Sequence, residues 1–214
     1  MPPLLLGHRG ARATRSVSEN TIASFDLALE HGCDGFEFDV RLTRDSHSVI
    51  CHDAEVCGIN IASANHSELN LPLLEDVIAR YARRAFLDIE LKVIGLEGAV
   101  LAALRRHAPS RFVVSSFLPQ VLSDLRSMDA NLPLGFICDR TDHLRRWPEL
   151  PVQYVIPRQD LVHRNLIREI HDGGKNVFVW TVNERDAIRR FADWGVDAII
   201  SDDTELLVRT LKGN

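Results

Sequence analysis

The chain alternates short runs of β-branched and aromatic residues with longer amphipathic segments, and this alternation restricts the fold more than any other feature. Eight runs have the length and composition of buried strands. The segments between them, such as Thr21–Gly32 and Asn183–Gly195, have a helical pattern that ends on glycine. The strand runs are Leu4–His8, Gly35–Val40, Ala85–Leu91, Phe112–Phe117, Leu132–Cys138, Gln153–Pro157, Asn176–Val182 and Asp197–Ser201.

Eight strand-helix repeats in 214 residues predict a (β/α)₈ TIM barrel, with residues 1–214 forming a single domain. A doubly wound open sheet is the alternative. The two architectures place functional residues differently. A barrel gathers the carboxyl ends of all its strands into one mouth, whereas an open sheet divides them about a switch point.

Polar residues fall late in the predicted strands or just after them. Such residues cost several kcal/mol when buried without partners, so their repeated placement at one end predicts a shared polar cavity. They are His8 and Arg9; Glu37 and Asp39; Asp88, Glu90 and Lys92; Ser115 and Ser116; Trp180 and Thr181; and Asp202 and Asp203.

One extended run interrupts the repeat. The sequence VICHD, residues 49–53, follows the second strand too closely for a helical crossover between parallel strands. We therefore expect a small β-hairpin insertion after the second strand, which brings His52 toward the mouth that contains His8.

Charge and hydropathy exclude several function classes. The net charge is −5 and the sequence has no basic run, which argues against nucleic acid as a partner. No apolar stretch approaches the ~20 residues that span a bilayer, and the N-terminus lacks the pattern of a secretory signal. We expect a cytoplasmic protein without stable membrane insertion. The four cysteines show no CxxC spacing, which argues against a thiolate zinc site.

Three carboxylates are candidate metal ligands. Glu37 and Asp39 are one residue apart and project from the same face of a strand, and Glu90 has a matching depth on the next strand. Oxygen ligands of this kind suit Mg²⁺ or Ca²⁺ better than zinc. The alternative is that they form ordinary ion pairs with Arg9, Arg41 and Lys92.

His8 and His52 are the candidate catalytic pair, because an imidazole exchanges protons near neutral pH and two of them can act as general base and general acid. The alternative is that each is a structural histidine.

Three further residues are candidate substrate-binding groups. The cations Arg9 and Lys92 would hold an anionic group, and the guanidinium fork suits phosphate oxygens. Trp180 offers a flat apolar wall to the remainder of a ligand, with core packing as the alternative role.

Ten ordered motifs resemble the glycerophosphodiester phosphodiesterase family, from His8 to Asp202. SEN stands where the family more usually has PEN. The segment between His52 and Leu71 is shorter than in many relatives, and for this reason we expect a more open pocket. The motifs are HRG at His8, SEN at Ser18, EFDV at Glu37, LTRD around Thr43, VICHD around His52, LPLLEDV at Leu71, DIELK at Asp88, VVSSF at Val113, VWTVN at Val179 and GVDAIISD at Gly195.

The resemblance implies a TIM barrel and a metal-dependent hydrolase that converts glycerophosphodiesters into glycerol 3-phosphate and an alcohol, within glycerol and lipid metabolism. It implies His8 and His52 as the acid-base pair and Asn20 as a residue that orients a carboxylate. The other implied groups are the metal ligands Glu37, Asp39 and Glu90, the phosphate-binding Arg9 and Lys92, and the pocket-lining Trp180.

Two other functions are compatible with the sequence. One is a lysophospholipase D-type phosphodiesterase that acts on longer lipids, which an apolar lip near the short insertion would favour. The other is a non-catalytic barrel that binds phosphorylated ligands, since a fold does not determine function. The sequence leaves open the leaving alcohol, the choice between Mg²⁺ and Ca²⁺, and the oligomeric state.

Overall fold

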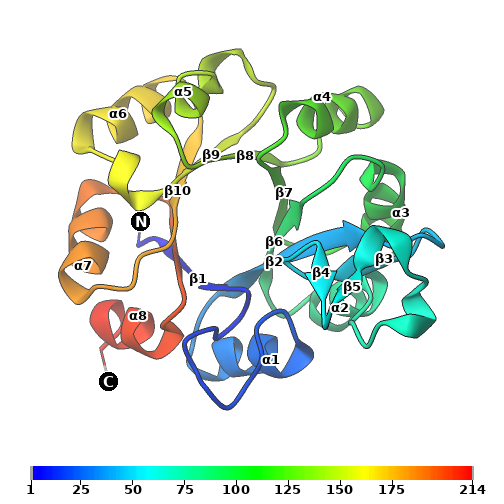
Figure 1. The fold of residues 1–214 in the computed structure, drawn as a ribbon. Coiled ribbons are helices and arrows are strands. Elements are labelled where there is room, and N and C mark those ends of the chain that lie inside the picture. The colour runs from blue at the N-terminus through cyan, green and yellow to red at the C-terminus, as the bar shows by residue number, and fades with distance from the viewer. Residues whose placement is uncertain (1, 214) are drawn as a thin grey trace.

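The computed structural model describes residues 2–213, and within them eight parallel strands close into a barrel. The first strand pairs with both the second and the last, so the open-sheet alternative is excluded. Figure 1 looks into the barrel, with the helices arranged around it. The barrel strands are β1 (Leu4–His8), β2 (Gly35–Leu42), β6 (Phe86–Leu91), β7 (Phe112–Ser116), β8 (Leu134–Cys138), β9 (Tyr154–Pro157), β10 (Asn176–Val179) and β11 (Ala198–Ser201).

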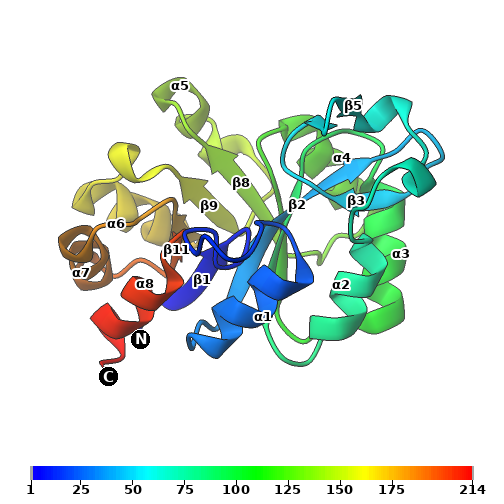
Figure 2. The ribbon, with the colours of Figure 1, turned by 60° about the horizontal axis from the view of Figure 1, so that its bottom comes forward.

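Helices follow the barrel strands and cover the outer face of the barrel (Figure 2). The Thr21 hydroxyl accepts a hydrogen bond from the backbone of Ser24 and so caps the first helix. Gly195 ends the seventh in the left-handed conformation that the glycine predicted. The helices are α1 (Ile22–Glu30), α2 (Leu74–Tyr81), α3 (Glu97–His107), α4 (Pro119–Met128), α5 (Thr141–Leu144), α6 (Arg164–Asp172), α7 (Arg185–Trp194) and α8 (Thr204–Leu211).

The predicted hairpin insertion is present. Strand β3 (Ser48–Ile50) runs antiparallel to β2, which extends two residues beyond its predicted end to pair with it. The insertion also contains a second hairpin that the sequence analysis did not predict, formed by β4 (Glu55–Val56) and β5 (Ile59–Asn60). Of the strands of the insertion, β3 lies beside α2 (Figure 1).

Two layers of buried apolar side chains stabilise the barrel. The larger lies between the strands and the helices and includes a stacked pair of rings, Phe25 and Phe36. The smaller fills the barrel interior and includes Leu6, Phe86 and Phe178. Because apolar side chains fill this interior layer, the polar side chains that project inward lie late in the strands, at their carboxyl ends.

Candidate active site

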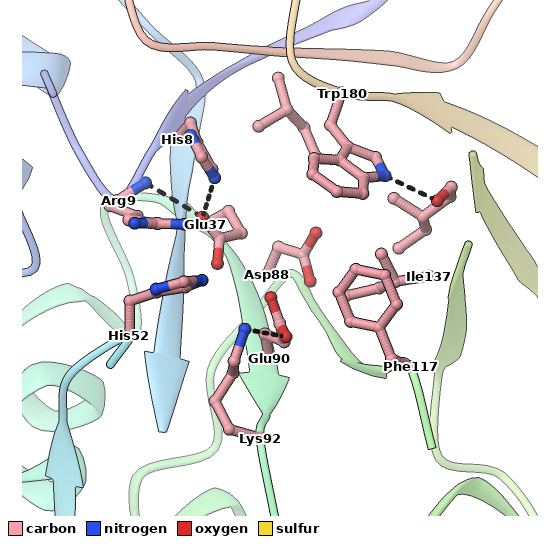
Figure 3. A pocket seen from close by; sticks show the side chains of 12 residues that line it. His8, Arg9, Glu37, His52, Asp88, Glu90, Lys92, Phe117, Ile137 and Trp180 are labelled. Atoms are coloured by element: carbon pink, nitrogen blue, oxygen red, sulfur yellow. Dashed lines mark hydrogen bonds and ion pairs between the residues drawn. The ribbon is translucent and has the colours of Figure 1, made fainter. Parts of the chain in front are cut away.

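A cavity opens among the carboxyl ends of the barrel strands. Seven of the eight predicted site residues line it, and the eighth, Asp39, lies beside it in the carboxylate cluster. Figure 3 shows the charged and apolar side chains that surround this space. The lining residues are His8, Arg9, Glu37, His52, Asp88, Glu90, Lys92, Phe117, Ile137, Ile156, Trp180 and Ile200.

The three predicted metal ligands are brought together by the register of the sheet. Asp39 pairs with Glu90 across β2 and β6, and Glu37 pairs with His8 across β1 and β2. One oxygen from each of Glu37, Asp39 and Glu90 lies within 4.8 Å of the others, and all three residues are buried. Residues in register on parallel strands point to the same face, so this convergence follows from the spacing in the sequence.

Ion pairs neutralise only part of the negative charge of these three carboxylates. Lys92 Nζ lies 2.6 Å from Glu90 Oε1 and 3.3 Å from Asp39 Oδ1, and Arg9 Nε lies 3.3 Å from Asp39 Oδ2. Arg41, the third cation of the ion-pair alternative, instead donates from Nε to the carbonyl oxygen of His52 at 2.8 Å. Glu37 receives a hydrogen bond from the Arg9 backbone N–H at 3.0 Å, but its Oε1 is buried without a hydrogen-bond partner.

The pKa values of the three carboxyl groups also indicate an excess of negative charge. Burial, then repulsion from Asp39 and Glu90, raises the pKa of Glu37 well above its usual value. Burial and Asp39 raise the pKa of Glu90 to about 7. Burial also disfavours ionised Asp39, but Lys92, a hydrogen bond from Asn20 and Arg9 together hold its pKa below the usual value. A divalent cation would compensate the excess negative charge, so the donor set fits Mg²⁺ or Ca²⁺.

The HRG triplet forms a tight turn that directs its backbone at this cluster. Arg9 has a left-handed backbone with φ of 54°, which costs about 1–2 kcal/mol for a residue with a side chain. Gly10 follows with φ of 81°, and a side chain there would collide with Ser24 at the start of α1. The turn is also fixed by Ser24 Oγ, which donates to the Arg9 carbonyl at 3.0 Å. The glycine is therefore required by both conformation and space.

Asn20 orients a carboxylate, as the resemblance implied. Its Nδ2 donates to Asp39 Oδ2 at 2.8 Å, and its Oδ1 accepts from the Asp39 backbone at 3.3 Å. Asn20 also has a left-handed backbone, with φ of 56°, a conformation that asparagine tolerates better than most residues.

His8 is held by an aspartate from the far end of the chain. Its Nδ1 lies 2.7 Å from Asp202 Oδ1, and its Nε2 lies 3.8 Å from Glu37 Oε2. Asn183 Nδ2 donates to Asp202 Oδ2 at 2.7 Å, and Arg12 Nη1 donates to Oδ1 at 3.2 Å. Although burial opposes it, the contact with His8, aided by Asn183 and Arg12, lowers the pKa of Asp202 to about 2. An ionised Asp202 accepts the Nδ1–H and leaves Nε2 directed at the cavity.

His52 lies at the opening of the same cavity, where the hairpin insertion was expected to place it. Its Nδ1 lies 2.7 Å from Asp53 Oδ1. The His52 side chain is 34% exposed, against 11% for His8, and Asp53 is 77% exposed. Burial lowers the pKa of His52, although Asp53 and Asp39 oppose the shift. His8 and His52 lie on either side of Glu37 (Figure 3).

Comparisons with known proteins agree with this geometry. The family model described as "Glycerophosphoryl diester phosphodiesterase family" matches residues 8–67 and 59–206. The chain belongs to the glycerophosphodiester phosphodiesterase family. It is accordingly an enzyme, a phosphoric diester hydrolase of this family.

Similar proteins share the full length of the chain. A glycerophosphodiester phosphodiesterase of Caldanaerobacter subterraneus is 29% identical, and the alignment covers 99% of each chain. A crystal structure of a putative glycerophosphoryl diester phosphodiesterase from Silicibacter pomeroyi has a TM-score of 0.89 at 26% identity, covering 99% of this chain and 93% of that one. An Oleispira antarctica phosphodiesterase, solved in complex with the product sn-glycerol-3-phosphate, shares the fold with a TM-score of 0.87 at 24% identity, covering 99% and 97% of the two chains.

The wall opposite the carboxylates is apolar. Ile137, Ile156 and Ile200 form its deep part, and Trp180 donates from Nε1 to the carbonyl oxygen of Ile156 at 3.0 Å. The Trp180 ring also packs edge-on against Phe117, with centroids 5.7 Å apart. Trp180 therefore lines the cavity and also packs against the barrel interior, and its contact with a substrate stays a prediction.

Three residues that the structure places at the site had no role predicted from the sequence. Asp88 lines the cavity, and Asp202 and Asn183 hold His8. All three occur within the motifs of the resemblance, and Asp88 and Asp202 are also polar residues at strand ends. Their partners could not be read from the sequence, because the contact between Asp202 and His8 spans 194 residues.

Within residues 2–213, no helix combines the length and the apolar character that crossing a membrane requires.

Proposed function

We propose that the enzyme hydrolyses glycerophosphodiesters to glycerol 3-phosphate and an alcohol, with His8 and His52 as its acid-base pair. The observation that carries this proposal is the convergence of the two imidazoles, from β1 and from the insertion, on one cavity. Arg9 and Lys92 line the same cavity and supply the positive charge that a phosphodiester requires.

In the proposed reaction, the 2-hydroxyl of the glycerol moiety attacks phosphorus. One histidine removes the hydroxyl proton, and the other protonates the leaving alcohol, so a P–O bond forms as another breaks. Water then opens the cyclic phosphate with the two roles reversed. Arg9 and Lys92 stabilise the negative charge that develops on the phosphoryl oxygens.

Glu37, Asp39 and Glu90 would hold a divalent cation, Mg²⁺ or Ca²⁺. The unpartnered Glu37 Oε1 and the three-oxygen donor set support this assignment. When bound, such an ion supplies Lewis-acid stabilisation of phosphoryl charge. Two other side chains position these groups. Asp202 fixes the His8 tautomer, and Asn20 fixes the orientation of Asp39.

The proposal is tested by measuring release of glycerol 3-phosphate from glycerophosphocholine and glycerophosphoethanolamine with Mg²⁺, with Ca²⁺ and with EDTA. We expect metal-dependent release that His52→Ala lowers by about 10²–10⁴-fold. Release that is undiminished in EDTA would overturn the metal assignment. Full activity in His52→Ala would overturn the acid-base pair.

A second candidate substrate is a lysophospholipid, which an apolar lip near the insertion favours. Ile59 on β5 is 39% exposed, and Ile94 after β6 is 61% exposed. Ile94 lines a groove that also contains Arg41, the residue that holds the His52 carbonyl. An acyl chain in this groove predicts that Ile94→Asp lowers release of choline from lysophosphatidylcholine and leaves glycerophosphocholine turnover unchanged. Equal effects on the two substrates would exclude the groove as an acyl site.

The non-catalytic alternative is not favoured, because both histidines and all three carboxylates are present and the chain belongs to an enzyme family.

A further inference from the structure

Asp88 is a carboxylate in the cavity that the proposed mechanism does not use. It lies on β6, is 0% exposed and points into the cavity (Figure 3). Ser115 Oγ donates to its Oδ1 at 2.6 Å, while its Oδ2 is buried without a hydrogen-bond partner. An unpartnered oxygen of this kind is costly, so it indicates a ligand group that satisfies it.

This oxygen is separate from the proposed cation site. The mutually close carboxylates are Glu37, Asp39 and Glu90, and Asp88 is not among them. The ion pairs of Arg9 and Lys92 go to other carboxylates within the described part of the chain. Asp88 therefore needs a partner of its own.

The surroundings of Asp88 restrict that partner in size and chemistry. The deep part of the cavity is closed by Ile137, Ile156 and Ile200, which are 4%, 1% and 2% exposed. His52, in contrast, lies at the partly exposed opening. A closed, largely apolar end with one polar oxygen suits a short aliphatic group that carries a single hydrogen-bonding atom.

We propose that Asp88 binds the terminal hydroxyl of the glycerol moiety, the hydroxyl that does not react. This inference rests on the proposed function and identifies what selects glycerol as the esterifying group. The variable alcohol then faces the open side of the cavity, and the glycerol end fills the closed side.

A hydroxyl matches this position better than the other groups of glycerophosphocholine. Phosphate oxygens carry negative charge and would be repelled by the carboxylate, and a quaternary ammonium has no hydrogen to donate. A hydroxyl both donates and accepts, so it pairs with Asp88 whether or not that carboxyl is protonated. The fixed contact from Ser115 leaves Oδ2 as the atom that faces the ligand.

The test compares two substrates that differ only in this hydroxyl. Glycerophosphocholine has it, and 2-hydroxypropyl phosphocholine lacks it but keeps the attacking 2-hydroxyl. We expect the wild-type kcat/KM to favour glycerophosphocholine by about 10- to 100-fold. Asp88→Ala should lose about that factor on glycerophosphocholine and little on the analogue, so the preference disappears.

Two further variants separate recognition from a structural role. Asp88→Asn keeps a hydrogen-bonding group of the same shape and should retain part of the preference. Asp76→Asn changes an exposed aspartate on α2 and should retain all of it. An equal loss on both substrates in Asp88→Ala and Asp88→Asn would show a structural role and overturn the proposal, as would a wild-type enzyme without preference.

A binding measurement keeps this test independent of turnover. Calorimetry of glycerol 3-phosphate and of 2-hydroxypropyl phosphate should show the same affinity ratio in the wild type and its loss in Asp88→Ala. If the wild type turns over neither diester, the proposed function fails, and the affinity ratio still decides the role of Asp88. Equal affinities for the two monoesters would overturn it.

Discussion

The two sides of the active-site cavity are buried to a similar degree, but they differ in what burial does to the free energy of folding. On β8, β9 and β11, the side chains of Ile137, Ile156 and Ile200 each stabilise the fold by about 1.5–3 kcal/mol when removed from water. On β2, Glu37 and Asp39 are equally removed from water, and burial of their charge costs free energy.

The difference indicates that the charged side is retained for chemistry and the apolar side for stability and shape. The apolar side also serves the charged one, because excluding water lowers the local dielectric constant and strengthens each interaction with the substrate's phosphate. Substitutions on the two sides should therefore affect activity and stability in opposite proportions.

The largest expected effect is on the charged side. Glu37→Gln removes a negative charge that the protein does not compensate, so kcat/KM should fall by about 10³-fold or more while metal-free stability is kept or rises. Turnover and urea unfolding in EDTA at pH 7 measure the two quantities. The matched control is Glu55→Gln, at an exposed position on β4, which should change neither. A metal-free Glu37→Gln that is clearly less stable than the wild type would contradict the comparison.

The opposite pattern is expected on the apolar side. Ile156→Ala leaves a cavity in the barrel interior and should lower the free energy of unfolding by about 2–5 kcal/mol, with less than about 10-fold change in kcat/KM. Chemical unfolding and turnover of glycerophosphocholine test this. Ile94→Ala, at a position 61% exposed, should leave stability unchanged. The distinction between the two sides fails if Ile156→Ala abolishes turnover while the protein remains folded.

A smaller effect on stability is expected for the contact between His8 and Asp202, which joins the first and last strands of the barrel. The folded-state pKa of Asp202 is about 2, below the value of about 3.9 for an unfolded chain, so its stabilisation is present above pH 4 and is lost as the pH falls toward 2. Between pH 5 and pH 2, the wild type should lose about 2 kcal/mol more stability than Asp202→Asn. Urea titrations across this range measure the difference.

Asp202→Asn should also lower kcat/KM by about 10- to 100-fold, because the amide no longer fixes the His8 tautomer. Asp53→Asn is the comparison, since Asp53 holds His52 from a position 77% exposed and should have a smaller effect on activity. Equal losses of kcat/KM in the two variants would mean that burial of the aspartate that holds each histidine does not affect activity.

Much of the fold could be predicted from the sequence, because each barrel strand is a short run rich in apolar residues that is buried along most of its length. All eight runs form strands of the barrel, and the polar residues at their ends identified the site. The hairpin of β4 and β5 was missed because its strands have two residues each. Its turn also uses Cys57 and Gly58 with positive φ, where asparagine or aspartate would have been the stronger signal.

The site was predictable where a rule relates spacing to direction. Glu37 and Asp39 share a face because side chains alternate along a strand, and Glu90 joins them through the strand register. The position of Asp88 follows the same rule, because it is in register with Glu37. Its role, like that of Asp202, depends on which neighbours fill its hydrogen bonds, and no local rule predicts those neighbours. That the chain forms a single domain, that the enzyme is cytoplasmic, and that it prefers Mg²⁺ or Ca²⁺ stay predictions.

Under the proposed mechanism, the contact between His8 and Asp202 makes activity depend on closure of the barrel. His8 belongs to the first strand to be synthesised, and Asp202 follows the last one. Glu37, Asp39 and Glu90 lie on β2 and β6, so all three are synthesised well before Asp202. Under the proposed mechanism, catalytic competence requires β11 to pair with β1, so enzyme activity would report that the barrel has closed.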